Sequence, residues 1–112
     1  MTDAPFGRLL TAMVTPMRPD GAVDSAGIGR VVEHLLASGH DGIVVNGTTG
    51  ESSTLTTQES IDVVRQVVER VDGRAHVVAG AGSNDTAHAV HLATEMAAVG
   101  ATGLLVVTPY YN

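Results

Sequence analysis

One local pattern occurs twice in this chain of 112 residues and constrains its fold more than any other feature. A glycine is followed by two residues, a second glycine and an apolar run, first over residues 39–45 and again over residues 100–106. A glycine after a helix adopts the left-handed backbone that commonly ends it, and the apolar run predicts a buried strand. The repeat therefore predicts two equivalent helix-to-strand units.

Strand and helix patterns alternate along the whole chain. Short apolar runs predict four strands, at residues 9–14, 42–45, 76–79 and 103–107. Three stretches between them carry apolar residues at helical spacing, and the predicted inward faces are Ile28, Val31, Val32, Leu35 and Leu36, then Ile61, Val64, Val68 and Val71, then Ala89, Val90, Ala93, Met96 and Ala97. Helix caps are predicted at Asp24 or Ser25, at the capping-box pair Thr56 and Glu59, and within residues 83–85.

The predicted element order is βαβαβαβ. Strands that are apolar without alternation are buried on both faces, which predicts a parallel sheet covered by helices. Two folds fit this order: a small doubly wound sheet, and the amino-terminal half of a (β/α)8 barrel, which needs roughly 250 residues in full. Because the sequence stops at Asn112 just past a strand, we expect an incomplete chain. The predicted fold class is α/β, with residues 1–112 forming the amino-terminal half of a single barrel domain.

The composition argues against several classes of protein. The formal net charge is -6, from 12 acidic and 6 basic residues, and every basic residue is arginine. A nucleic-acid groove or a polybasic membrane contact needs clustered positive charge, so neither is expected. The absence of cysteine excludes disulfides and thiolate metal sites, and no apolar run is long enough to span a bilayer. We expect a soluble cytoplasmic protein.

Polar segments follow the predicted strands, where function is expected in either fold. The run Gly47-Thr48-Thr49-Gly50-Glu51-Ser52 follows the second strand. Its glycines allow the backbone to approach a ligand, and its adjacent hydroxyls can bind a carboxylate or pass a proton. An ordinary polar loop is the alternative interpretation. Gly80-Ala81-Gly82 does not complete a dinucleotide-binding motif, because Asp85 stands where the third glycine belongs.

Histidines and tyrosines supply the other candidate groups. His88, His91 and Glu95 share one helix face at metal-ligand spacing, but a solvated face explains them and no metal site is predicted. Tyr110 and Tyr111 stand together after the fourth strand, and a phenol can accept and donate a proton. Aromatic packing against a neighbouring loop or subunit explains the two tyrosines equally well.

Five segments, in this order and spacing, resemble the dihydrodipicolinate synthase (4-hydroxy-tetrahydrodipicolinate synthase) family of pyruvate-dependent class I aldolases. They are residues 12–16 (Ala-Met-Val-Thr-Pro), 20–24 (Asp-Gly-Ala-Val-Asp), 47–55, 79–84 (Ala-Gly-Ala-Gly-Ser-Asn) and 106–112 (Val-Val-Thr-Pro-Tyr-Tyr-Asn). Gly-Thr-Thr-Gly-Glu-Ser and the final Tyr-Tyr-Asn favour the synthase over N-acetylneuraminate lyases. The related 2-keto-3-deoxy-sugar-acid aldolases remain an alternative.

The resemblance implies a full (β/α)8 barrel, usually a homotetramer of tight dimers. It implies a lyase of lysine and diaminopimelate biosynthesis that condenses pyruvate with L-aspartate 4-semialdehyde through a lysine Schiff base, without a cofactor. This chain contains no lysine, so we expect it to be inactive alone. By the same resemblance Thr49 holds the pyruvate carboxylate, while Thr48 and Tyr111 relay protons. Tyr111 is expected to reach the neighbouring subunit's site.

The resemblance also implies a feedback site for lysine at the dimer interface. Ser52, Asn84 and Tyr110 match that site, whereas two histidines and a glutamate are replaced by Thr57, Ser60 and His88. Because loss of the glutamate removes a partner for the lysine amine, we expect weak feedback. Two other hypotheses stay open: a non-catalytic half barrel that binds a small carboxylate or a partner, and a complete doubly wound regulatory domain.

Overall fold

The structure, a computed structural model, describes residues 4–111; Met1–Asp3 and Asn112, the last residue of the 106–112 segment, lie outside the described residues. Three helices, α1 (Ser25–Ala37), α2 (Thr57–Val71) and α3 (Thr86–Ala98), alternate with four strands, β1 (Leu10–Ala12), β2 (Gly42–Val45), β3 (His76–Gly80) and β4 (Gly103–Leu105). Two short 3-10 helices, η1 (Thr48–Gly50) and η2 (Ser52–Thr54), lie between β2 and α2. Within residues 4–111 we find no helix with the length and apolar character of a membrane span.

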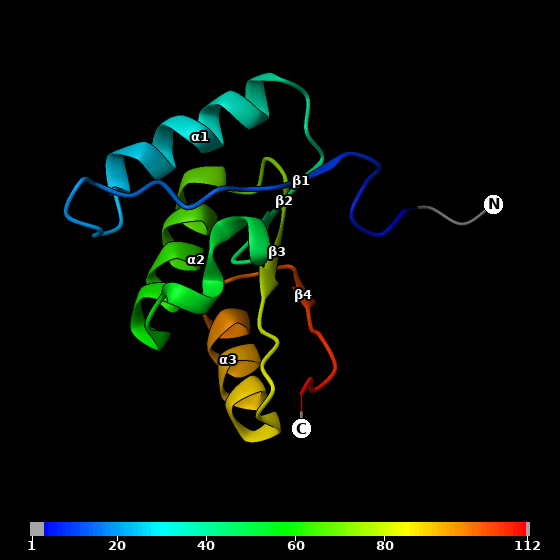
Figure 1. Cartoon of the computed structure of the whole chain (residues 1–112). Helices are drawn as coiled ribbons and strands as arrows, with labels where there is room; N and C mark the ends of the chain where they lie inside the picture. The colour runs from blue at the N-terminus through cyan, green and yellow to red at the C-terminus, as the bar shows by residue number, and fades with distance from the viewer. Residues whose placement is uncertain (1–3, 112) are drawn as a thin grey trace.

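The strands form one parallel sheet in the order β1-β2-β3-β4. Each new strand is added at the same edge, and the three helices follow one another along one side of the strands (Figure 1). A doubly wound sheet instead reverses its strand order at a switch point and carries helices on both faces. The order observed here is that of a (β/α)8 barrel, so the predicted α/β fold class and partial barrel are confirmed.

The two faces of the sheet have different environments. Alternate strand residues on one face form a single apolar core with the helices, and they are Met13, Ile43, Val45, Val77, Ala79 and Ala81. Val44 and Val78 are register partners on the opposite face, the face that lines the interior of a barrel. Leu104 and Leu105 point to opposite faces of the edge strand β4 and are 42% and 52% exposed. The packed core therefore lies on the helix-covered face of β2 and β3.

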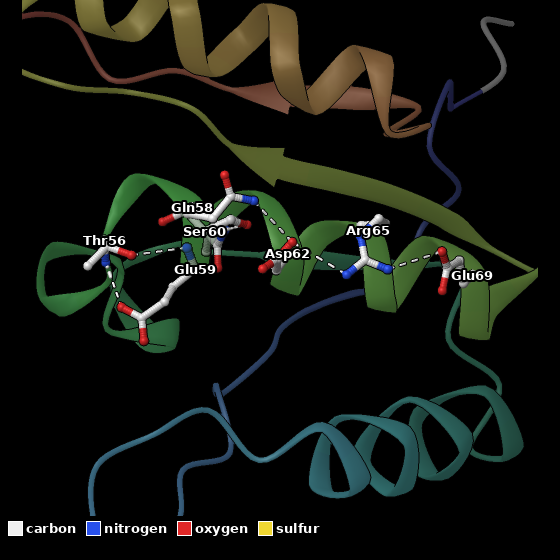
Figure 2. Close-up of polar contacts among 8 residues, drawn as sticks. Thr56, Gln58, Glu59, Ser60, Asp62, Arg65 and Glu69 are labelled. Carbon is white, nitrogen blue, oxygen red and sulfur yellow. Dashed lines mark hydrogen bonds and ion pairs between the residues drawn. The ribbon is translucent and has the colours of Figure 1, made fainter.

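Local signals explain where the helices begin and end. The carboxylate of Asp24 accepts a hydrogen bond from Gly27 N in the first turn of α1, and that of Asp85 accepts one from Ala87 N in the first turn of α3. Thr56 and Glu59 form the predicted capping box, with Glu59 N donating to Thr56 Oγ1 at 3.1 Å and Thr56 N donating to Glu59 Oε1 at 2.8 Å (Figure 2). Further along α2, Arg65 bridges Asp62 and Glu69 (Figure 2). These contacts favour a helix in spite of many valines.

The helix-ending glycines of the repeat are confirmed. Gly39 and Gly100 have φ of 84° and 105°, directly after the C-caps of α1 and α3. The repeat also places Asp41 just before β2, where its carboxylate accepts hydrogen bonds from Arg8 N at 2.8 Å and Leu9 N at 2.9 Å. These two backbone donors hold the pKa of Asp41 below its ordinary value of 3.8. Asp41 therefore joins the start of the chain to β2.

The predicted inward face is correct for α1, correct but incomplete for α2, and partly wrong for α3. In α2, Val63 and Val67 are fully buried, whereas Ile61 and Val68 are only partly buried. The reason is that α2 contacts both α1 and α3 as well as the sheet, which widens its buried face.

In α3, the predicted Met96 is buried, whereas the predicted Val90 and Ala97 are exposed and Leu92, which was not predicted, is buried. Alanines surround this helix, so its apolar pattern gives little contrast between faces. His88 lies one turn before Leu92 on the same side and is half-buried, so the prediction of a wholly solvated histidine face is wrong.

Candidate functional site

The carboxyl ends of the parallel strands meet at one end of the sheet, and the segments that follow them surround two adjoining hollows. The hollows measure about 300 Å³ and about 310 Å³. We call them together the strand-end cleft, and the residues that line both are Asn46, Ser52, Ser53, Gly80, Gly82 and Tyr110. Three of these carry hydroxyls, which can both donate and accept hydrogen bonds.

The loop from Gly47 to Ser52 forms one wall of the cleft. Its backbone is compact, because Gly50 N donates to Gly47 O at 3.0 Å and Glu51 N donates to Thr48 O at 2.9 Å. Glu51 then takes the left-handed conformation, with φ 57°. Gly50 is buried, while the side chains of Thr48 and Thr49 are exposed. The loop therefore presents two adjacent hydroxyls from a folded backbone.

Two buried polar side chains form hydrogen bonds beside this loop, one to the loop itself and one from the residue that precedes it to α2. Thr15, which follows β1 and is 5% exposed, donates from Oγ1 to Gly50 O at 2.7 Å. Asn46, which follows β2 and is 4% exposed, donates from Nδ2 to Ser60 O at 2.8 Å. The Oδ1 atom of Asn46 is buried without a hydrogen-bond partner among residues 4–111. The sequence places Thr15 at the functional end of the first strand without assigning it a role, and Asn46 was not predicted as part of the site.

The structure brings three of the predicted site residues together. Thr48 lines the second hollow, and Ser52 and Tyr110 line both. Thr49 is adjacent to Thr48 in the chain and exposed, and Asn84 is exposed just before α3. Both lie outside the set of residues that line the cleft.

Tyr111 lies apart from the cleft. It is 99% exposed, with φ 62°, and its ring packs edge-on against Tyr110 at a centroid distance of 5.8 Å. Tyr111 is not among the described residues that line either hollow, so residues 4–111 do not bring its hydroxyl together with Thr48 in the cleft.

The first hollow is lined by the three residues that the resemblance places where a feedback-sensitive enzyme has two histidines and a glutamate. They are Thr57, Ser60 and His88, beside Ser52 and Tyr110. Among the described residues that line either hollow there is no carboxylate. A cationic amine placed there would lack a charged partner. Within residues 4–111, no group of three His, Asp or Glu side chains is arranged to hold a metal ion.

Comparisons with known proteins agree on one family. The family model described as "Dihydrodipicolinate synthetase family" matches residues 5–112. The chain is 58% identical, over 108 residues, to 4-hydroxy-tetrahydrodipicolinate synthase 2 of Streptomyces coelicolor, covering 96% of this chain and 36% of that protein. The chain thus spans about a third of the length of the relatives it matches.

Solved structures agree with this comparison. A dihydrodipicolinate synthase from Bacillus anthracis superposes with a TM-score of 0.93 and 45% identity, over 96% of this chain and 37% of that one. The chloride-inhibited dihydrodipicolinate synthase of Acinetobacter baumannii complexed with pyruvate gives a TM-score of 0.91 and 39% identity, over 93% of this chain and 36% of that one.

Proposed function

The chain belongs to the dihydrodipicolinate synthetase family, and from that premise we propose that it is the amino-terminal part of a 4-hydroxy-tetrahydrodipicolinate synthase. The observation that carries the proposal is the folded loop Gly47–Ser52, which presents Thr48 and Thr49 at the carboxyl end of β2. Active sites of (β/α)8 enzymes are built from such loops. The 58% identical Streptomyces relative and the pyruvate complex of the Acinetobacter relative support the same assignment.

The proposed reaction condenses pyruvate with L-aspartate 4-semialdehyde in lysine and diaminopimelate biosynthesis. A lysine amine attacks the keto carbon of pyruvate, water leaves, and the resulting Schiff base loses a methyl proton before its carbon adds to the aldehyde. That lysine comes from outside residues 1–112, because this sequence contains none. Under this proposal, residues 1–112 are therefore inactive by themselves. Their part in the reaction is to bind the pyruvate carboxylate and to transfer protons.

Three residues of this chain have proposed roles in that reaction. Thr49 binds the pyruvate carboxylate, because its exposed hydroxyl can donate a hydrogen bond to an anion. Thr48 passes protons, as its place in the cleft allows. Tyr111 completes the relay from a neighbouring subunit, and its place outside the described lining of the cleft is compatible with that role. The enzyme is then a cytoplasmic homotetramer of tight dimers, with residues 1–112 in one barrel domain.

Ser52, Tyr110 and Asn84 have a separate proposed role in an effector site at the dimer interface. Ser52 and Tyr110 line the first hollow together with His88. Because no carboxylate lines that hollow among the described residues, we propose that lysine binds there weakly.

A chimera tests the proposed function. It joins residues 1–112 to the part of the Streptomyces coelicolor synthase that this chain does not cover, which supplies the remaining barrel. We expect the chimera to consume pyruvate and L-aspartate 4-semialdehyde together. Its kcat/KM should lie within about tenfold of that of the Streptomyces coelicolor synthase, which corresponds to about 1.4 kcal/mol in the activation barrier.

The matched control is the Thr49→Val chimera, which keeps the shape of the side chain and loses its hydroxyl. Pyruvate release from N-acetylneuraminate and from a 2-keto-3-deoxy sugar acid is measured in parallel. A folded, tetrameric chimera that prefers either of those substrates, or that turns over none of them, contradicts the proposal.

A further inference from the structure

We propose that Thr15 and Asn46 are positioning residues that hold the Gly47–Ser52 loop at its two ends and so set the places of Thr48 and Thr49. The contacts around the loop support the claim that Thr15 and Asn46 hold its backbone in place. The claim that this affects catalysis rests on the proposed function above.

Thr15 holds the far end of η1. Its hydroxyl donates to Gly50 O at 2.7 Å, in a buried setting and across 35 positions of sequence. The contact is close, because a side chain built on Gly50 would lie 3.1 Å from Thr15 Oγ1 and 3.2 Å from Met13 O. Gly50 therefore packs directly on the end of β1, and its buried carbonyl depends on Thr15 for a hydrogen bond.

Asn46 holds the near end of the loop. It takes the left-handed conformation, with φ 61°, which asparagine tolerates better than most residues. Its Nδ2 donates to the backbone carbonyl of Ser60 in the first turn of α2. Any side chain at Gly80 of β3 would collide with the carbonyl oxygen of Asn46, so the neighbouring strand also confines this residue.

Thr48 and Thr49 lie between these two fixed points and have exposed side chains. Exposed side chains receive little support from packing, so their positions follow the backbone that carries them. Between the two anchors, the turn hydrogen bonds Gly50 N to Gly47 O and Glu51 N to Thr48 O hold the backbone. Since reacting groups must be held closely for catalysis, loss of either anchor should misplace both hydroxyls.

The test compares Thr15→Val with Thr15→Ser in the chimera described above. Valine keeps the shape of the side chain and removes the donor, whereas serine keeps the donor. For Thr15→Val we expect amide exchange of residues 47–51 to accelerate about tenfold or more, with β3 unchanged, and kcat/KM for pyruvate to fall about 10- to 100-fold. For Thr15→Ser we expect both quantities within about threefold of the unsubstituted chimera.

Asn46→Gly provides a second, independent variant. Glycine keeps the left-handed backbone without strain and removes only the side-chain anchor. We expect the same two changes as for Thr15→Val, and this variant decides the inference if Thr15→Val does not fold. A purely structural role instead raises exchange throughout the barrel, lowers the melting temperature and leaves kcat/KM of the folded enzyme unchanged.

Local exchange and kcat/KM that remain at the level of the unsubstituted chimera in both variants would overturn the inference. Failure of the proposed function has a different signature, because the unsubstituted chimera is then inactive. In that case the exchange of residues 47–51 still decides whether Thr15 and Asn46 hold the loop.

Discussion

Replacement of Tyr111 by phenylalanine should separate catalysis from stability in the chimera. The side chain is 99% exposed and its ring contacts Tyr110 edge-on at 5.8 Å. Phenylalanine keeps that ring contact and, in the proposed assembly, most of the packing of the ring at the subunit interface. We therefore expect the free energy of unfolding to change by no more than about 0.5 kcal/mol, the low end of the net contribution of one hydrogen bond.

The effect on turnover should be far larger. If the phenol of Tyr111 relays protons to a neighbouring site, its loss removes a general acid and base worth about 10²–10⁴ in rate. That factor corresponds to about 2.7–5.4 kcal/mol in the activation barrier. The expected barrier change is thus at least about five times the expected change in stability.

The assay measures kcat for Tyr111→Phe, Thr48→Val and the double variant, with urea denaturation for stability and sedimentation for oligomer size. Two groups in one relay should show losses that do not add, because breaking either end already stops transfer. A kcat for Tyr111→Phe close to that of the unsubstituted chimera would refute the relay. Losses that multiply in the double variant would place the two hydroxyls in separate steps.

Three further predictions concern stability and regulation in the same chimera. Thr56→Ala should lower the free energy of unfolding by about 1 kcal/mol, because it removes the hydroxyl that accepts from Glu59 N; an unchanged urea midpoint contradicts this. The pKa of Asp41 is lowered in the folded state, so its carboxylate contributes stability above its ordinary value of 3.8 and loses it as pH falls through the lower folded value. Asp41→Asn should therefore flatten the acid side of the stability profile, and an identical profile rejects the assignment. Lysine at about 1 mM should inhibit weakly, because His88 and not a carboxylate lines the first hollow; strong inhibition shows that the site tolerates this change.

Much of the fold follows from local sequence signals. The caps at Asp24 and Thr56 and the glycines at residues 39 and 100 each act within a few residues, so a single sequence reveals them. The sequence does not show which side of α3 packs against the core, because the alanines of this helix make its sides similarly hydrophobic. Only the packed structure shows that Leu92 faces the core and Val90 faces solvent.

The candidate site likewise has one part that the sequence predicts and another part that it does not. The loop Gly47–Ser52 is visible as a motif because its own residue types carry the chemistry. Its anchors are not visible, since Thr15 and Asn46 donate to backbone carbonyls 35 and 14 positions away. A carbonyl acceptor has no side-chain signature, so no pairing rule in the sequence connects these residues. Buried polar residues directly after apolar strands are the one signal that could have indicated them.

The central claim is that residues 1–112 supply the carboxylate-binding loop of a pyruvate aldolase. A crystal structure of the chimera with pyruvate trapped on its lysine by borohydride tests this claim most directly. The account predicts the pyruvate carboxylate within hydrogen-bond distance, about 2.6–3.2 Å, of the Thr49 hydroxyl or the loop amides. A carboxylate bound at another strand end, with the Gly47–Ser52 loop facing only solvent, would contradict the account.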